Sequence, residues 1–298
     1  MRLVWLWLSG PVLGLFSSGL GVLNLIHLLL AGLWGLAVWA YFGAAVTRIA
    51  AVQLACEERL AWSSVLRHAA RKWPAYFAAP LIPMLGIALC AAPLALIGLL
   101  ARAHLGLLLV VLWPLALVAG LLMAVLLLGL IFGWPLMWAT ISTEGSDSFD
   151  ALSRSYAYVF QRPLHYLFYL IVAGLFGALG WYLVSQFAAG VIGLSYWAVG
   201  WGSGAAHPAQ GFSGVRFWVD AVKILAFGFI FSYFWTATTA IYYLLRHGVD
   251  ATEMDEVFLE DEGQAYGLPP LKTEGPGAPA VVDAPADAAD SAKEDNEE

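Results

Sequence analysis

The stretch AHLGLLLVVLWPLALVAGLLMAVLLLGLIFGWPLMWATIST, residues 103–143, contains no Asp, Glu, Lys or Arg. A helix needs about 20 apolar residues to cross the hydrocarbon of a bilayer. In that hydrocarbon every backbone polar group must be bonded within the chain, which only helices and closed barrels achieve. The run does not alternate between polar and apolar residues as a barrel strand does. It therefore predicts an all-α polytopic membrane protein.

Four more runs without a charged side chain surround it, and together they predict about six transmembrane helices. The expected spans are 3–17, 22–46, 78–101, 106–140, 164–187 and 217–245. A Gly/Trp-rich loop is expected over 188–215. An alternative for residues 1–19 is a signal peptide, because an Arg precedes an apolar run that ends in small residues. The sequence GLFGALG, residues 174–180, predicts a close helix-packing seam.

The positions of the basic residues predict the orientation of the spans in the membrane. Basic residues concentrate in 47–73 and 141–162, which the positive-inside rule places in the cytoplasm. The run at 103–143 then crosses once, and both termini are cytoplasmic in the cell (inner) membrane. Only 12% of residues are charged, about half of what a soluble domain carries. No nucleic-acid partner is expected.

The end of the chain differs in composition from the rest. Residues 251–298 hold 14 acidic residues and two lysines, hence −12, while 1–250 hold 12 basic and 7 acidic residues, hence +5. The sequence predicts an acidic cytoplasmic tail that is disordered from about residue 268. Such a tail either recruits a basic protein partner or only solvates. At its start, the apolar residues of TEMDEVF, 252–258, are expected to pack on the cytoplasmic face or to dock a partner.

Two polar segments predict interfacial amphipathic helices, at 58–73 and 146–160. In the second, Ser146 is the expected N-cap and Pro163 ends the helix; in the first, Pro74 ends it. The expected apolar face of the second helix consists of Phe149, Leu152, Tyr156, Val159 and Phe160, which recur at helical spacing. Such helices lie in the plane of the membrane surface.

The two segments match each other at a constant offset of 87 residues. Glu57 matches Glu144, Arg67 matches Arg154, and Pro74 matches Pro163 after two further residues. Both copies lie on the same predicted side, so this pattern indicates a parallel internal repeat.

Three stretches resemble uncharacterised multi-span bacterial membrane proteins: TRIAAVQLACEERL (47–60), FDALSRSYAYVFQRP (149–163) and YLLRHGVDATEMDEVFL (243–259). The layout is remotely similar to the six-span YciC-like proteins and to the membrane domain of some glycerophosphodiester phosphodiesterases. The resemblance implies a membrane location. The phosphodiesterase chemistry of the remote group would reside in a separate soluble domain.

Arg67 and Arg154 are candidates for binding lipid headgroups, because an interfacial guanidinium can grip a phosphate with two hydrogen bonds. The alternative is that both are anchors whose side chains reach the headgroups without selectivity. Glu57 and Glu144 are acidic candidates that either pair with these arginines or relay protons. The alternative is that they are ordinary acids at a helix start.

Asp220 and Lys223 lie three residues apart in an expected span and are the intramembrane charged candidates. Their spacing also allows them to neutralise each other. The sequence shows no metal-binding spacing, no nucleotide-binding motif and no nucleophile motif. It predicts a non-enzymatic integral membrane protein without a cofactor, which organises lipid or partner proteins. The alternative is a transporter or lipid-translocating protein.

Overall fold

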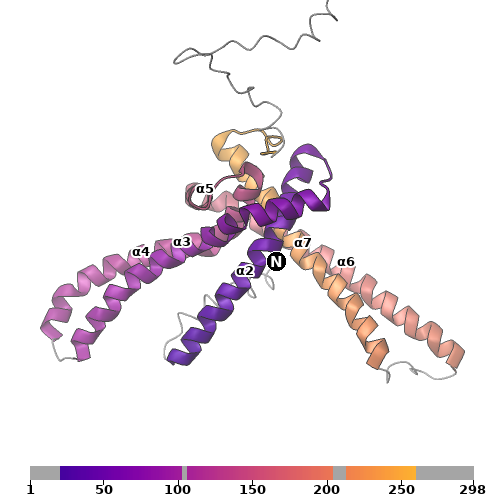
Figure 1. The fold of residues 1–298 in the computed structure, drawn as a ribbon, viewed down its shortest axis with the longest axis horizontal. Helices are drawn as coiled ribbons and strands as arrows, with labels where there is room; N and C mark the ends of the chain where they lie inside the picture. The colour runs from indigo at the N-terminus through magenta and orange to yellow at the C-terminus, as the bar shows by residue number, and fades with distance from the viewer. Residues whose placement is uncertain (1–20, 103–105, 204–212, 260–298) are drawn as a thin grey trace, which may run out of the picture. The chain divides into compact units, whose positions relative to one another are not determined.

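The computed structural model describes residues 21–102, 106–203 and 213–259, and every element in those ranges is a helix. The helices are α2 Val22–Cys56, α3 Trp62–Arg102, α4 Gly106–Glu144, α5 Ser148–Gln161, α6 Pro163–Ser203 and α7 Ser213–Asp250 (Figure 1). The predicted all-α class is confirmed. The expected span at 3–17, the signal-peptide alternative and the tail from residue 260 onward lie outside the described residues.

The five helices other than α5 are long and apolar enough to cross a membrane. Each contains one of the spans expected between residues 22 and 245. They are longer than a bilayer requires. Helices α3 and α6 have 41 residues each, which corresponds to about 60 Å, roughly twice the thickness of the hydrocarbon.

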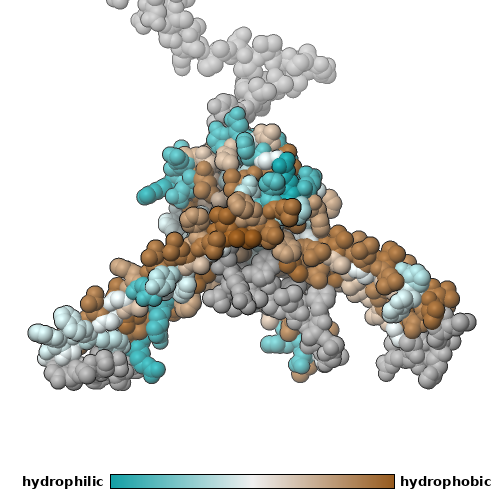
Figure 2. Space-filling view, turned by 180° about the vertical axis from the view of Figure 1, so that it is seen from behind, coloured by the Kyte–Doolittle hydropathy of each residue, from teal (hydrophilic) through white to brown (hydrophobic). Residues whose placement is uncertain are grey.

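Buried side chains occupy only one half of each long helix, the half nearest α5. Buried hydrophobic residues begin at Ala40 in α2, at Leu130 in α4 and at Ile230 in α7, and they end at Ile87 in α3. We call this packed half the α5 end. The other halves carry exposed Leu, Val, Phe and Trp side chains, which form the brown surfaces that extend along the helices in Figure 2. Much of the hydrophilic surface in that view lies at the α5 end.

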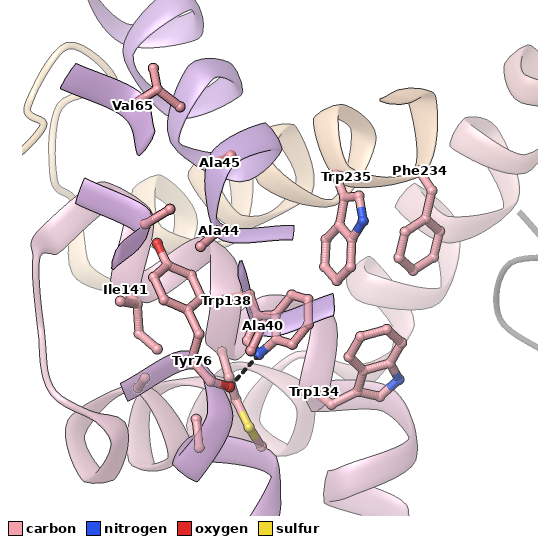
Figure 3. Packing of buried hydrophobic residues seen from close by; sticks show 14 of the residues in the cluster. Ala40, Ala44, Ala45, Val65, Tyr76, Trp134, Trp138, Ile141, Phe234 and Trp235 are labelled. Carbon is pink, nitrogen blue, oxygen red and sulfur yellow. Dashed lines mark hydrogen bonds between the residues drawn. The ribbon is translucent and has the colours of Figure 1, made fainter. Parts of the chain in front are cut away.

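Aromatic rings from α4 and α7 form the centre of the core (Figure 3). Trp138 and Trp235 are fully buried and stack with their ring centroids 4.7 Å apart. Trp134 meets these rings edge-on at 5.7 and 5.5 Å. The indole N–H of Trp138 donates to the carbonyl of Tyr76 in α3 at 2.8 Å. Helix α2 approaches the same ring through Gly43, where a Cβ atom would overlap Trp138.

Helix α3 corrects the expectation that Pro74 ends a helix. It runs unbroken through Pro74 and contains three further prolines. The expected interfacial helix at 58–73 and the span at 78–101 are therefore joined into one helix. Proline is tolerated in membrane helices because neighbouring helices and local adjustments satisfy the carbonyl that it frees. Here Ala69 and Tyr76, on either side of the proline, are both fully buried, so packing holds the helix together across it.

The loop expected at 188–215 is corrected over 188–203, because α6 continues to Ser203, and over 213–215, where α7 begins, while 204–212 lie outside the described residues. Glycines in this segment suggested a loop, since glycine in a helix costs about 1 kcal/mol relative to alanine. That cost is small beside the cost of leaving backbone groups unbonded in hydrocarbon. The expected seam at 174–180 is confirmed at two of its three glycines: a Cβ at Gly177 or Gly180 would lie 2.5 or 2.7 Å from a ring of α7, whereas a Cβ at Gly174 would meet nothing within 4 Å.

Helix α5 is the polar helix expected at 146–160, but its cap differs from the prediction. The N-cap is Asp147 rather than Ser146, and its carboxylate accepts hydrogen bonds from the backbone N–H groups of Phe149 and Asp150 at 3.0 and 2.8 Å. Pro163 begins α6, as expected, at the position where a missing N–H costs least.

The buried face of α5 also differs from the predicted face. Ala151, Ser155, Tyr158 and Val159 are buried, whereas Phe149 and Phe160 are 68% and 47% exposed. The small side chains face α4, where the atom Ser155 Cβ would lie 3.6 Å from a Cβ at Gly133. Small residues on both helices thus bring α5 against the end of α4.

Candidate functional site

A cluster of buried polar side chains lies at the α5 end, where α2, α3, α4 and α7 meet. We call it the polar junction, and it consists of Thr47, Arg48, His68, Tyr76, Thr140, Ser142, Thr143, Glu144, Tyr242 and Arg246. All are buried except Glu144, whose side chain is 12% exposed. Polar groups buried this deeply require partners, so their contacts determine what the cluster does.

Glu144, the last residue of α4, is the centre of the charged part of the polar junction. Its carboxylate accepts a hydrogen bond from the hydroxyl of Tyr242 at 2.6 Å. It also lies 3.3 Å from Nε of Arg246, whose side chain is only 7% exposed. A third partner is Arg154 of α5, at 3.1 Å. One carboxylate therefore ties α4, α5 and α7 together.

Glu144 pairs with Arg154, which was one of the alternatives open for this acid, and the pairing changes the interpretation of Arg154. The Arg154 guanidinium also pairs with Asp150 one turn earlier, at 3.2 Å. Partial burial by itself would lower the pKa of Arg154, but the carboxylates of Glu144 and Asp150 outweigh it and raise that pKa. The guanidinium is thus charged and already held by two carboxylates.

Arg48 of α2 connects the polar junction to the segment after α7. One guanidinium nitrogen donates to the carbonyl of Ser142 and another to the carbonyl of Phe258, each at 2.7 Å. The backbone N–H of Phe258 in turn donates to the carbonyl of Thr143 at 2.7 Å, and Arg246 donates to the carbonyl of Glu256 at 2.7 Å. We call residues 256–258 the strap.

The side chain of Phe258 adds an apolar contact to the strap. Its ring lies over Gly145, where a Cβ would be 2.5 Å from the ring and where φ is +63°. Both observations require glycine at this position. Packing of the segment at 252–258 on the helices, one of the two outcomes expected for it, is therefore present at Phe258. Met254 in the same segment is 42% exposed.

A chain of hydrogen bonds fills the interior of the polar junction. It runs from His68 to the hydroxyl of Tyr76 at 3.3 Å, then to Ser142 at 2.7 Å and to Thr47 at 2.6 Å. Thr47 donates to the carbonyl of Gly43 at 2.8 Å. These bonds hold α2, α3 and α4 in register.

A neighbouring contact joins α5 to the end of α7. The hydroxyl of Tyr158 donates to the carboxylate of Asp250. Burial raises the pKa of Tyr158, and the hydrogen bond to Asp250 raises it further. The phenol is therefore protonated at neutral pH and acts as a stable donor.

The remaining predicted candidates lie outside the polar junction. Glu57 is exposed in a left-handed conformation at the end of α2, with φ of 59°. Arg67 is exposed on α3 and has no ion pair among the residues that the structure describes. Asp220 and Lys223 pair with each other at 2.9 Å and are 62% and 55% exposed. That pair is about 40 Å along α7 from Arg246, at 1.5 Å per residue.

Sequence reasoning missed Arg48, Tyr242 and Arg246. Both arginines stand at the end of an uncharged run, where a basic residue is ordinarily an anchor at the membrane surface. Only the packing of helices distant in the chain shows that they are buried. In the described parts of the chain, no three His, Cys, Asp or Glu side chains are placed to hold a metal ion.

Comparison with protein-family models, curated proteins and solved structures finds no match for this chain. The resemblance to YciC-like and phosphodiesterase-linked membrane proteins stays a sequence-based expectation.

Proposed function

We propose that the chain is an integral membrane protein that organises lipid or partner proteins at the cytoplasmic face of the membrane. The observation that carries the proposal is the polar junction at the α5 end. The buried residues Arg48 and Arg246, the partly exposed Arg154 and the nearly buried carboxylate of Glu144 join α2, α4, α5 and α7 there, together with the strap. A fully partnered polar network gives a rigid, specific arrangement, which suits a platform that presents fixed surface groups.

The distribution of polar groups favours this function over transport. Within the described residues, buried polar side chains gather at the α5 end, and the opposite halves of the long helices are largely exposed apolar surface. A transport path requires polar or ionisable groups at membrane depth that face a cavity. Asp220 and Lys223 are the charged pair away from the α5 end, but they neutralise each other on an exposed surface.

The test is to extract the protein in native-lipid discs and to compare the lipid classes in the discs with those of the surrounding membrane. The platform function predicts enrichment of one lipid class, or of a stoichiometric protein partner. Glu144→Gln, which weakens the polar junction, should reduce the enrichment at a temperature where the variant is still folded. Lys223→Ala, at the other end of α7, is the matched control and should retain it.

Two results would contradict the proposal. One is a disc composition that equals the bulk membrane, with no partner, in wild type. The other is solute flux in proteoliposomes that is abolished by replacing both Asp220 and Lys223 by alanine while the protein stays folded, because that result supports a transporter.

A further inference from the structure

The structure separates the basic residues near the α5 end into two groups with different surroundings. Arg48, Arg154 and Arg246 are held by carbonyls or carboxylates, and Lys72 donates to the carbonyl of Gly145. These residues serve the fold. The second group is exposed, and it contains Arg59, Arg67, Arg71 and Arg162.

Arg67 and Arg71 differ from the rest of the exposed group because they form a pair. They are four residues apart in α3, so their side chains are neighbours on one face of the helix, with Cβ atoms about 6 Å apart. Neither has an ion pair within the described ranges, and no acidic residue occurs anywhere between Trp62 and Arg102. The two positive charges are thus unneutralised by their own helix.

The orientation of this face is set by burial on the opposite side. Val65 and Ala69 are 1% and 0% exposed and pack into the core. Trp62 and Leu66 are 72% and 39% exposed and, at about 100° per residue, lie on the flank of the helix between the buried face and the basic pair. This part of α3 thus exposes an aromatic and an aliphatic side chain on one flank and two guanidinium groups on the side opposite the core, which is typical of a helix at a bilayer interface.

The unbroken course of α3 also places this face beside the bilayer. Arg67 and Arg71 lie near the start of the apolar candidate span Trp62–Gly98, which has no charged residue after Lys72. A guanidinium pair at the start of such a span lies where phosphate groups of lipids are found. Arginine binds phosphate through paired hydrogen bonds.

We propose that Arg67 and Arg71 together bind the phosphate of an anionic phospholipid. This inference rests on the proposed function and names the ligand class for it. The sequence made Arg67 and Arg154 equal candidates for a lipid phosphate, but Arg154 is already paired with Glu144 and Asp150. Arg67 is therefore the candidate of the two that remains. The two halves of the predicted repeat then have different roles: α3 binds lipid, and α5 completes the polar junction.

The test uses the full chain in detergent, titrated with mixed micelles or discs of phosphatidylcholine that contain a fixed fraction of phosphatidylglycerol. Retained lipid is identified by mass spectrometry after partial delipidation. The variants are Arg67→Gln/Arg71→Gln and, as a control with the same loss of charge, Arg59→Gln/Arg162→Gln. All of these arginines are exposed, so folding should survive, and matched melting temperatures verify this.

Wild type should retain phosphatidylglycerol selectively, and the Arg67/Arg71 variant should bind it at least about tenfold more weakly, as expected for two lost interfacial charges. The control should change binding by less than about threefold if the site is specific. Soluble glycerol 3-phosphate should not displace the lipid, because it lacks the acyl chains that keep the lipid in the bilayer next to the basic pair.

Equal losses in the two double variants would overturn the inference, since they indicate diffuse charge attraction. Displacement by glycerol 3-phosphate would overturn it as well, in favour of a site for free phosphate esters. If wild type is selective and neither variant changes the selectivity, the proposed function survives and the assignment to Arg67 and Arg71 fails. If wild type shows no selectivity in these discs and none in native-lipid discs, the lipid form of both proposals fails.

Discussion

Replacing Glu144 by alanine is the sharpest test of the polar junction. The substitution leaves the Arg246 guanidinium without its carboxylate while 93% of that side chain stays buried, since it is 7% exposed. Removing one partner of a buried pair costs about 3–5 kcal/mol. Arg246 retains the Glu256 carbonyl at 2.7 Å and the Glu256 carboxylate at 3.6 Å, so the lower limit, about 3 kcal/mol, applies. Arg154 adds less than about 1 kcal/mol because its side chain is 42% exposed.

The assay is thermal unfolding in one detergent at one scan rate, because unfolding of membrane proteins is rarely reversible. A loss of about 3 kcal/mol lowers the midpoint by about 6–12 °C for a domain of this size. Glu144→Gln retains an acceptor for Tyr242 and should show about half of that shift. Glu58→Ala, an exposed acid just before α3, is the control and should shift the midpoint by less than about 2 °C.

A shift of less than about 2 °C for Glu144→Ala would refute the reasoning, because it would mean that the charges of the polar junction do not depend on one another. The double variant Glu144→Ala/Arg246→Met provides an independent check. Removing both buried charges should cost less than the sum of the single changes, since contacting residues are not additive. A strictly additive result would show that the two side chains do not interact.

Three further changes test other parts of the structure. Gly43→Ala places a methyl group in the Trp138 ring and should lower the free energy of unfolding by about 1–3 kcal/mol, measured by thermal unfolding. The control is Gly35→Ala, where the structure leaves open space; it should leave the stability unchanged or raise it by up to about 1 kcal/mol. Equal effects of the two substitutions would contradict the packing of Gly43 against Trp138. Phe258→Ala should speed hydrogen exchange of the residue-258 amide, which the strap holds, and unchanged exchange would show that the ring is not needed. Lys223→Ala should change the free energy of unfolding by less than about 1 kcal/mol because the Asp220–Lys223 pair is exposed. A larger loss would indicate that a second copy of the chain buries this pair.

The candidate site was predictable in part, and the reason lies in distance along the chain. Glu144 and Arg154 are ten residues apart, so a turn between two helices brings them together, and their pairing follows from local pattern. Arg48 and Arg246 are separated by 198 residues. Each resembles a surface anchor in its own surroundings, and their burial depends on α2 meeting α4 and α7.

The predicted repeat shows the same limit. Glu57 and Glu144 occupy matched positions, but Glu57 lies in the exposed turn after α2, whereas Glu144 is within the last turn of α4 and faces α7. Among the residues that the structure describes, Arg67 consequently has no carboxylate of the kind that holds Arg154. A match in residue type does not show which of two arginines is available to a ligand.

By itself the sequence determined that the chain consists of apolar helices long enough to cross a membrane, because that property follows from local composition and from the cost of unbonded backbone in hydrocarbon. It also determined the polar helix at α5 and the start of α6 at Pro163. The tertiary structure decided that α3 continues through Pro74 and that the core occupies only the half of the helices next to α5. It also decided which arginines are buried. These outcomes depend on what packs against a residue from distant parts of the chain, and neither hydrophobicity nor spacing contains that information.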